Sequence, residues 1–251
     1  PVWKIMGKKN FLWYTSGGVT FKLKLAEKFT NVVFTASKES FRLPSKKVII
    51  TGHGIDTNLF KPSFSRSDLG GLQRSDLRIL SVGRIAPVKN YETLIEAAKI
   101  LKDKGVDFSV TMVGEASPVK KDTNYKLQIT NKIKELGLEN NFNFVGKINH
   151  KDLPQYYQSH DVFIHLSKTG SLDKTVLEAM ACGIKILSSN DASHSFLPAD
   201  LIFDDKNPSE LADKIIAIKD EPVDSKLRDY VAQNHNLERL ILKISGIIIN
   251  K

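Results

Sequence analysis

A segment near residue 175 combines residue types that could hold an anion. It runs from Lys168 to Gly183 with the sequence KTGSLDKTVLEAMACG, and it follows an apolar stretch at 161–166. A glycine-bearing turn that leads into a helix points unpaired backbone N–H groups, and the positive end of the helix dipole, at the space above a sheet. Glu178 stands one turn into that helix, where its carboxylate would reach hydroxyl groups such as those of a ribose. The segment therefore predicts a site for a phosphate-bearing ligand.

The same segment has a second interpretation that needs no ligand. Thr175 and Glu178 are three residues apart, which is the spacing of a capping box, where two side chains satisfy the first amides of their own helix. The segment alone does not decide between an anion site and a capping box.

A second segment carries two cations on a short loop. Gly83 to Asn90 reads GRIAPVKN, in which Pro87 stiffens the loop and Asn90 is placed to cap the helix that follows. Arg84 and Lys89 both lie on this loop, so they could grip one diphosphate, each charged hydrogen bond contributing about 1.5 to 3 kcal/mol. The alternative is a pair of exposed basic side chains without a ligand.

The elements that would position these loops alternate along the chain. The hydrophobic pattern predicts helices at 91–102, 125–136, 152–159, 175–182 and 209–219, and strands at 77–82, 108–113, 142–145, 161–166, 185–188 and 201–203. Such alternation predicts an α/β fold: a doubly wound parallel sheet with helices on both faces. Ligands bind such sheets at the carboxyl ends of the strands.

Four of these strands end in small residues. Glycine follows Val82, Val113 and Val145, and the strand at 161–166 ends in Ser-Lys-Thr-Gly170. Turn chemistry explains any single glycine, but four such ends on one edge predict a single cleft to which a ligand can come close.

The first 60 residues predict an incomplete lobe. Short β-type runs at 11–14, 31–34 and 47–50 flank a helical pattern at 21–29. Three parallel strands with one helix leave sheet edges and faces bare, so we expect residues 1–60 to be the remnant of a lobe whose earlier strands are missing from this chain. The predicted organisation continues with a linker at 61–76, a second lobe at 77–235 that carries the predicted ligand site, and a helix at 236–251 that packs back on the first lobe.

The composition indicates a globular protein without a disulfide framework. Of 251 residues, 41% are hydrophobic and 26% charged, which is ordinary for a globular protein. The single cysteine, Cys182, excludes a disulfide framework, and we interpret it as a buried filler rather than a nucleophile. No signal peptide and no run of about 18 apolar residues is recognisable, so we expect a cytoplasmic protein.

Charge points to anionic partners. The chain has 37 Lys and Arg against 28 Asp and Glu, a net charge of +9, which favours nucleotide phosphates, an acidic membrane face or nucleic acid. No block of interleaved basic and aromatic residues is present, so we exclude nucleic acid. The six histidines lack zinc-type spacing, and no Asp-x-Asp cluster lies near the predicted site, so we expect no metal.

Two of these motifs together resemble a known family. Gly83-Arg-Ile-x-Pro-x-Lys-Asn90, followed by Leu177-Glu-Ala-Met-Ala-Cys-Gly183, resembles the retaining glycosyltransferases of the two-Rossmann-lobe (GT-B) type, group 1 or family 4. The likeness extends to the segment 52–56, Gly-His-Gly-Ile-Asp, ahead of the second lobe.

The resemblance implies an activity and its partners. A hexose would pass from a nucleotide-sugar donor to a glycan or lipid-linked acceptor, with retention of configuration and without a metal or other cofactor. The expected setting is cell-envelope polysaccharide synthesis, with peripheral association of the protein with the acidic inner face of the membrane.

The resemblance also implies roles for individual residues. Arg84 and Lys89 match the catalytic basic pair that neutralises the donor's diphosphate, and Glu178 matches the residue that holds the ribose hydroxyls. The remaining donor-binding positions implied by the family are Gly83, Gly146, Lys147, Ile148, Leu172, Asp173, Lys174 and Thr175.

Two departures from the family pattern keep alternatives open. A family glutamate that touches the donor sugar falls on Gly170 here, where we hypothesise that Asp173 or Lys174 takes its place, and a family histidine falls on Ser16. We interpret His53 as structural. The departures favour a non-catalytic nucleotide-sugar binding module, or a truncated remnant of an enzyme, as the alternative to a transferase. A sugar-nucleotide epimerase on the same fold is a third hypothesis, which the motifs suit less well.

Overall fold

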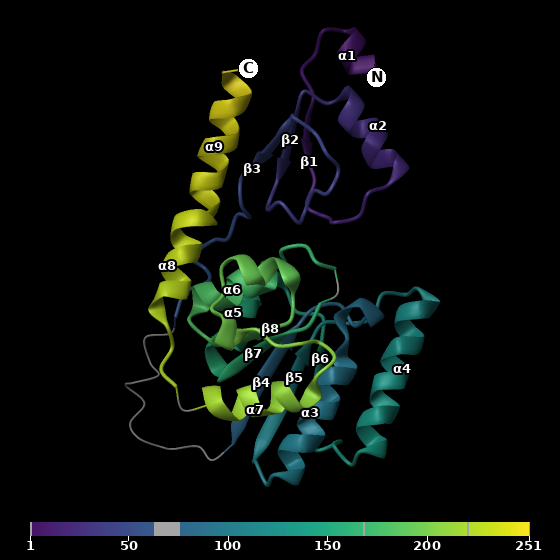
Figure 1. Ribbon diagram of the computed structural model, residues 1–251, viewed down its shortest axis with the longest axis vertical. Helices are drawn as coiled ribbons and strands as arrows, with labels where there is room; N and C mark the ends of the chain where they lie inside the picture. Colours follow the sequence, from purple (N-terminus) through teal and green to yellow (C-terminus); the bar gives the residue numbers. More distant parts are fainter. Residues whose placement is uncertain (1, 63–75, 168, 220, 251) are drawn as a thin grey trace.

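The protein contains two parallel β-sheets, one above the other in Figure 1. The computed structural model describes residues 2–62, 76–167, 169–219 and 221–250. The larger sheet has the strand order β6-β5-β4-β7-β8. Its strands are β4 (Leu77–Val82), β5 (Phe108–Val113), β6 (Phe142–Gly146), β7 (Val162–His165) and β8 (Lys185–Ser188). Because β4, the first strand of this sheet, lies at its centre, the order reverses there, as in a doubly wound fold.

Helices cover both faces of the larger sheet. Alternate residues of a strand point to opposite faces, so Ile79 packs in one core cluster and Leu80 in the other. One cluster joins the sheet to α3 (Tyr91–Asp103), α4 (Lys120–Glu135) and α7 (Pro208–Ile218), and the other to α5 (Leu153–Ser159), α6 (Lys174–Cys182) and α8 (Ser225–Asn234). The predicted doubly wound α/β fold is confirmed.

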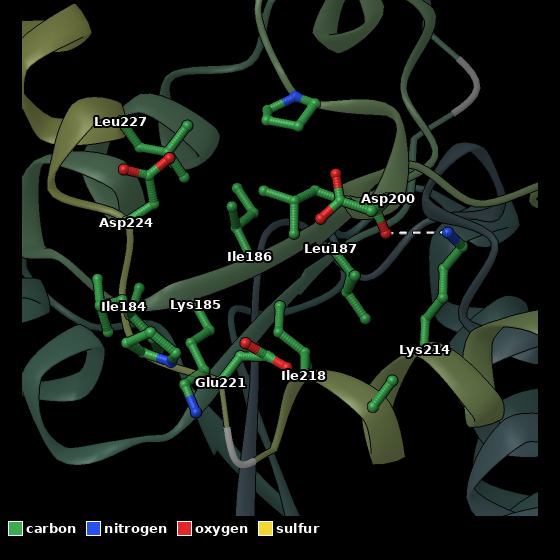
Figure 2. Close-up of a pocket in the computed structure, with 15 residues that line it drawn as sticks. Ile184, Lys185, Ile186, Leu187, Asp200, Lys214, Ile218, Glu221, Asp224 and Leu227 are labelled. Carbon is green, nitrogen blue, oxygen red and sulfur yellow. Dashed lines mark hydrogen bonds between the residues drawn. The ribbon is translucent and has the colours of Figure 1, made fainter.

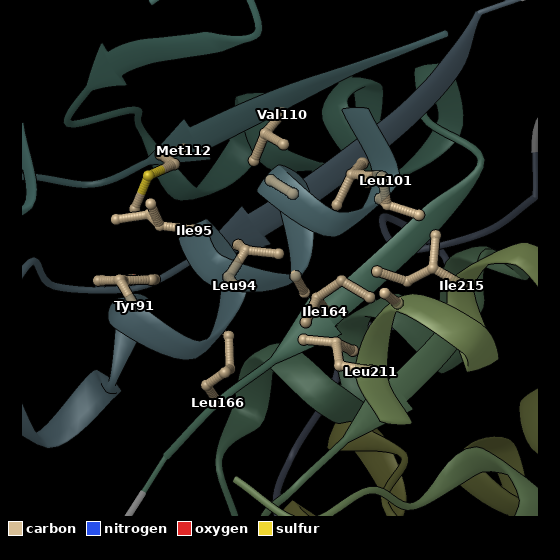
Figure 3. Close-up of a cluster of buried hydrophobic side chains, with 14 of the residues drawn as sticks. Tyr91, Leu94, Ile95, Leu101, Val110, Met112, Ile164, Leu166, Leu211 and Ile215 are labelled. Carbon is tan, nitrogen blue, oxygen red and sulfur yellow. The ribbon is translucent and has the colours of Figure 1, made fainter. Parts of the chain in front are cut away.

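Solvent does not reach the side chains on the α3 side of this core. Leu94, Leu101, Ile164, Leu211 and Ile215 are all 0% exposed and meet between α3, β7 and α7 (Figure 3). Truncating a buried leucine to alanine typically costs about 2 to 5 kcal/mol. The core therefore holds the start of α3, and with it the loop that follows β4, in a fixed position.

The smaller sheet lies in the first part of the chain. Its strands β1 (Phe11–Trp13), β2 (Val32–Thr35) and β3 (Val48–Ile50) pair in that order, all parallel. The remaining elements here are α1 (Val2–Ile5) and α2 (Phe21–Phe29). The hydroxyl of Thr20 caps α2 by accepting from the amide of Leu23 at 3.1 Å, which explains why the helix begins where the sequence pattern predicts.

Two chain segments cross between the sheets and are hydrogen-bonded to each other. The Ile55 amide donates to the His235 carbonyl at 2.7 Å, and the Leu237 amide donates to the Ile55 carbonyl at 2.9 Å. Helix α9 (Leu237–Ile249) then rises beside β3 (Figure 1), where the Lys243 ammonium donates to the Ile50 carbonyl at 3.0 Å. Most of the predicted linker at 61–76 falls on 63–75, outside the described residues.

The predicted strand at 201–203 is wrong. A 3-10 turn at Ala199–Leu201 takes up the first of its residues, and the rest make only an isolated bridge between Ser188 and Ile202. The sequence pattern also missed α8. Asn90 is at the N-terminal boundary of α3, but its side chain does not cap the helix; the side-chain Nδ2 donates to the Asp205 carbonyl instead.

Candidate functional site

Four loops meet at the carboxyl edge of the larger sheet. The Gly83 amide, after β4, donates to the Val113 carbonyl at 2.9 Å, and the Gly114 amide, after β5, donates to the Gly146 carbonyl at 2.8 Å. A Cβ atom on Gly114 would lie 2.0 Å from the Gly83 carbonyl oxygen, and its φ of +132° also favours glycine. The loops therefore pack backbone against backbone, which only glycine at position 114 permits.

An ion pair joins the loop after β4 to the loop after β7. Lys89 Nζ lies 2.6 Å from Asp173 Oδ2, and the lysine side chain is only 15% exposed. Burial alone would raise the pKa of Asp173, but a hydrogen bond from His165 and the charge of Lys89 together hold that pKa well below its usual range. Asp173 is therefore a carboxylate, and Lys89 is oriented by it.

Helix α6 begins beside this ion pair without a capping side chain. Asp173 is at its N-terminal boundary but makes no side-chain bond to the helix amides. The Thr175 hydroxyl is buried and has no hydrogen-bond partner in the part of the chain that the structure describes. Because Glu178 bonds to other side chains, the capping-box interpretation is wrong. The Val176 amide donates to the Asp173 carbonyl at 3.3 Å, so among the described residues the Lys174 and Thr175 amides are left to whatever approaches this end of the helix.

Glu178 lies one turn further along α6 and is held by two side chains. Its Oε1 is 2.9 Å from His150 Nε2, and its Oε2 accepts from the Tyr157 hydroxyl at 3.2 Å. Burial raises the pKa of Tyr157 well above its usual value, so this phenol stays a donor. The carboxylate of Glu178 is 4% exposed and the ring of His150 63%. A ligand hydroxyl would therefore reach Glu178 most easily by displacing His150.

Arg84 is held by a different carboxylate from Lys89. Its Nε lies 3.5 Å from Asp122 Oδ2 in the first turn of α4, and the Ser117 hydroxyl donates to the same oxygen at 2.7 Å. The Arg84 side chain is 59% exposed. The two cations thus stand on one loop, but each has its own acidic partner.

The other predicted positions differ in exposure. Lys147 and Lys174 are exposed, Ile148 is half-buried, and Leu172 is buried. The Leu172 carbonyl accepts from His53 Nε2 at 2.8 Å, which fits the structural role expected for His53. Lys168 lies outside the described residues.

Arg42 reaches this site from the smaller sheet's side of the molecule. Its Nη2 donates to the Gly170 carbonyl at 3.2 Å, and a Cβ atom on Gly170 would lie 2.3 Å from the same nitrogen. The guanidinium thus takes the space in which a longer side chain at position 170 would begin. Arg42, Asp122, His150 and His165 were missed by sequence reasoning, because each is far along the chain from the residue it contacts or carries no motif of its own.

A pocket and the single cysteine lie away from these residues. A pocket of about 410 Å³ opens at the β8 edge (Figure 2), where apolar side chains such as Ile186 and Leu187 alternate with charged ones such as Asp200 and Lys214; it contains none of the predicted site residues. Cys182 is buried, and burial raises the pKa of its thiol to about 12, consistent with a filler. Among the described residues, no group of three or more His, Cys, Asp or Glu side chains is placed to hold a metal ion.

Comparison with known proteins gives the family. Residues 70–237 match the model of the glycosyl transferases group 1 family. The chain belongs to this family. A D-inositol 3-phosphate glycosyltransferase of Paenarthrobacter aurescens is 27% identical over 183 residues, which are 70% of this chain and 44% of that protein. A mannosylfructose-phosphate synthase of Agrobacterium fabrum is 29% identical over 149 residues, 58% of this chain and 33% of that protein.

Structural comparison agrees with the fold. The crystal structure of Anabaena HepE in complex with UDP and glucose matches with a TM-score of 0.84 at 18% identity, covering 99% of this chain and 73% of that chain. The chain therefore has the α/β fold of the group 1 glycosyl transferases, and it spans less than half the length of the two curated relatives described above. No helix in the described ranges is long and apolar enough to cross a membrane.

Proposed function

We propose that this chain binds a nucleotide-diphosphate sugar at the loops of β4, β6 and β7 and transfers its hexose to an acceptor. The observation that carries the proposal is the position of Lys89 Nζ, 2.6 Å from Asp173 and hence beside the uncapped start of α6. Glu178 follows Asp173 by five residues, about 7.5 Å along the helix. That spacing suits a diphosphate at the helix end and a ribose beside Glu178.

The proposed chemistry is stabilisation of charge on the leaving group. Cleavage of the bond between sugar and phosphate leaves negative charge on the nucleotide diphosphate. Arg84, Lys89 and the first amides of α6 would meet that charge more strongly as it develops, which lowers the barrier. The residues at 146–148 would border the base, and Leu172 to Thr175 would supply further phosphate contacts. Retention of configuration and independence of metal are part of the proposal, as the resemblance to family 4 implies.

The comparisons support a nucleotide sugar as the donor. HepE, which has the same fold, is described in complex with UDP and glucose. Two of the sequence relatives carry the names D-inositol 3-phosphate glycosyltransferase and mannosylfructose-phosphate synthase. For this chain we infer the same class of donor, a nucleotide-diphosphate sugar.

The proposal extends to the acceptor and the cellular setting. A glycan or lipid-linked acceptor would enter from the loops of the smaller sheet, from which Arg42 reaches the Gly170 carbonyl beside the proposed donor site. Phe21, Lys22 and Lys24 at the start of α2 are exposed, and apolar and basic side chains together suit contact with an acidic membrane face. Cytoplasmic location and a role in cell-envelope polysaccharide synthesis belong to the same proposal.

Release of nucleoside diphosphate from a panel of UDP-, GDP- and ADP-hexoses tests the activity. We expect one donor class to be turned over, and Lys89→Ala to lower the rate by about 10- to 100-fold, the cost of a lost charged hydrogen bond. Lys99→Ala is the matched control, because Lys99 lies on the exposed face of α3 and pairs with Asp103. Equal rates in the Lys89 variant and the control would contradict the proposal.

A further inference from the structure

A line of hydrogen-bonded side chains lies behind Lys89. Lys89 Nζ is 2.6 Å from Asp173 Oδ2, which is 2.9 Å from His165 Nε2. His165 Nδ1 is in turn 3.3 Å from the Ser188 hydroxyl, which is 3.0 Å from the Ser193 hydroxyl. The line joins the loop after β4, the start of α6, the end of β7, the end of β8 and the turn after it. We call these five residues the Lys89 relay.

The direction of each bond in the relay follows from Asp173. An ionised carboxylate can only accept, so His165 Nε2 must carry its proton and His165 Nδ1 must accept. The Ser188 hydroxyl then donates to His165, and the Ser193 hydroxyl donates to Ser188. His165 is 2% exposed and Ser188 0%, and burial lowers the pKa of His165, which keeps its ring neutral and suits this order.

Within the relay Lys89 uses only part of its hydrogen-bond donor capacity. An ammonium has three N–H groups, and among the described residues Asp173 is the hydrogen-bond partner of Lys89. Two N–H groups therefore remain for a ligand at the start of α6. A lysine has a flexible four-carbon stem, so a carboxylate fixed in one place restricts where the ammonium can point. Asp173 is fixed by His165, which belongs to a buried strand.

We propose that His165 is a positioning residue: through Asp173 it fixes the Lys89 ammonium at the start of α6. His165 itself does not touch the ligand, because its ring is 2% exposed and its two nitrogens are bonded to Asp173 and Ser188. This inference rests on the proposed function only for the identity of the ligand that Lys89 meets; the positioning of Lys89 is a property of the protein alone.

Two substitutions at position 165 separate a positioning role from a general structural one. His165→Leu removes the donor to Asp173 but keeps an apolar side chain in the buried site. His165→Gln keeps an N–H donor at about the distance of Nε2 from the backbone. Ser188→Ala, which alters the relay one step further from Lys89, serves as a milder third variant. Thermal unfolding of each variant shows whether it is folded at the temperature of the assay.

The first readout needs no ligand. Acetic anhydride acetylates neutral lysine amines, and mass spectrometry resolves the extent at each lysine. In His165→Leu, Asp173 loses the hydrogen bond from His165 that fixes it beside Lys89. We expect acetylation of Lys89 to rise about tenfold there, the size expected for one hydrogen bond to a charged group. In His165→Gln acetylation should stay within about twofold of wild type. Lys132, which pairs with Glu96 on the surface away from the site, is the internal control and should not change.

The second readout separates binding from turnover in the same variants. With the donor that wild type turns over, His165→Leu should lower kcat about tenfold and leave KM within about threefold, because Lys89 acts mainly on the charge that develops during cleavage. His165→Gln should restore most of the rate. A rise in KM alone, or no rescue by glutamine, would overturn the role in turnover.

The outcomes also separate this inference from the proposed function. If wild type binds no nucleoside diphosphate but acetylation of Lys89 still rises in His165→Leu alone, the proposed function fails and the positioning role holds. If acetylation of Lys89 is the same in wild type and both variants, the positioning role is overturned whatever the protein binds.

Discussion

Glu178 is held by two partners of unequal exposure, and this difference makes its role testable. Tyr157 is fully buried, whereas His150 is 63% exposed, so a ribose hydroxyl can replace His150 without disturbing the core. We predict that Glu178→Gln weakens binding of the preferred nucleoside diphosphate about tenfold, as for one charged hydrogen bond. The 2′,3′-dideoxy form should bind wild type and variant equally, as measured by calorimetry. Equal losses for both ligands would contradict contact with the ribose.

Substitutions of Arg84 and of Asp122 should lower kcat/KM by different amounts. The ion pair between them spans 3.5 Å and Arg84 is 59% exposed, so the pair itself is worth at most about 1 kcal/mol. We predict that Asp122→Asn lowers kcat/KM only about threefold, whereas Arg84→Ala lowers it by about 10- to 100-fold. Steady-state kinetics with the preferred donor checks the order. A larger loss in Asp122→Asn than in Arg84→Ala would show that Arg84 does not meet the diphosphate.

For single residues, the sequence identifies those that stand in motifs but not the side chains that bond to them. Lys89 and Glu178 stand in recognisable patterns, and the structure places both at one edge of the larger sheet. The contact of Asp173 with His165 joins a loop to a strand that looks apolar in the sequence. Arg42 meets Gly170 across 128 positions of the chain. Such partners depend on which loops the fold brings together, and no local pattern encodes that.

The elements around the site depend on one close backbone contact. We predict that Gly114→Ala destabilises the protein by about 2 kcal/mol more than Gly105→Ala, because overpacking adds to the strain of the backbone. Both glycines have a positive φ, but a Cβ atom on Gly105 would meet no atom within 4 Å, whereas one on Gly114 would lie 2.0 Å from the Gly83 carbonyl oxygen. Urea unfolding gives the free energy of unfolding of both variants. Equal losses would mean that the loops after β4 and β5 move apart at no cost in stability.

Hydrophobic periodicity predicts most elements of this fold because most of them are long or fully buried. Strands β4 and β5 and helix α2 have the bounds that the sequence predicts. The run at 201–203 has the composition of a strand, but Pro198 and the 3-10 turn at Ala199–Leu201 leave only Ile202 to pair with Ser188. Helix α8 carries few apolar residues, and only Leu227 and Val231 are buried, so its pattern gives a weak signal.

In the molecule as a whole, a pair of buried histidines lies where two chain segments cross between the sheets. The His53 amide donates to His235 Nδ1 at 3.0 Å, and burial lowers the pKa of His53 and brings that of His235 to about 4. In the unfolded chain both rings titrate near pH 6.5. Because the unfolded state binds more protons below that pH, stability is complete above pH 6.5 and falls as the pH drops toward 4.

We therefore predict that His235→Asn reduces the loss of stability between pH 7.5 and pH 4.5. Asparagine keeps an acceptor for the His53 amide but does not titrate, so up to about 3 kcal/mol of the pH dependence should disappear. Urea unfolding at the two pH values measures the difference. A pH dependence that is the same in wild type and variant would show that another group dominates.

Binding of a nucleoside diphosphate to wild-type protein and to Lys89→Ala tests the central claim most directly. Calorimetry with UDP, GDP and ADP should show one of the three binding to wild type. In Lys89→Ala that affinity should fall about 10- to 100-fold, while Lys99→Ala should bind like wild type. If wild type binds none of the three, or if Lys89→Ala binds as tightly as Lys99→Ala, the loops of β4 and β7 do not form a diphosphate site.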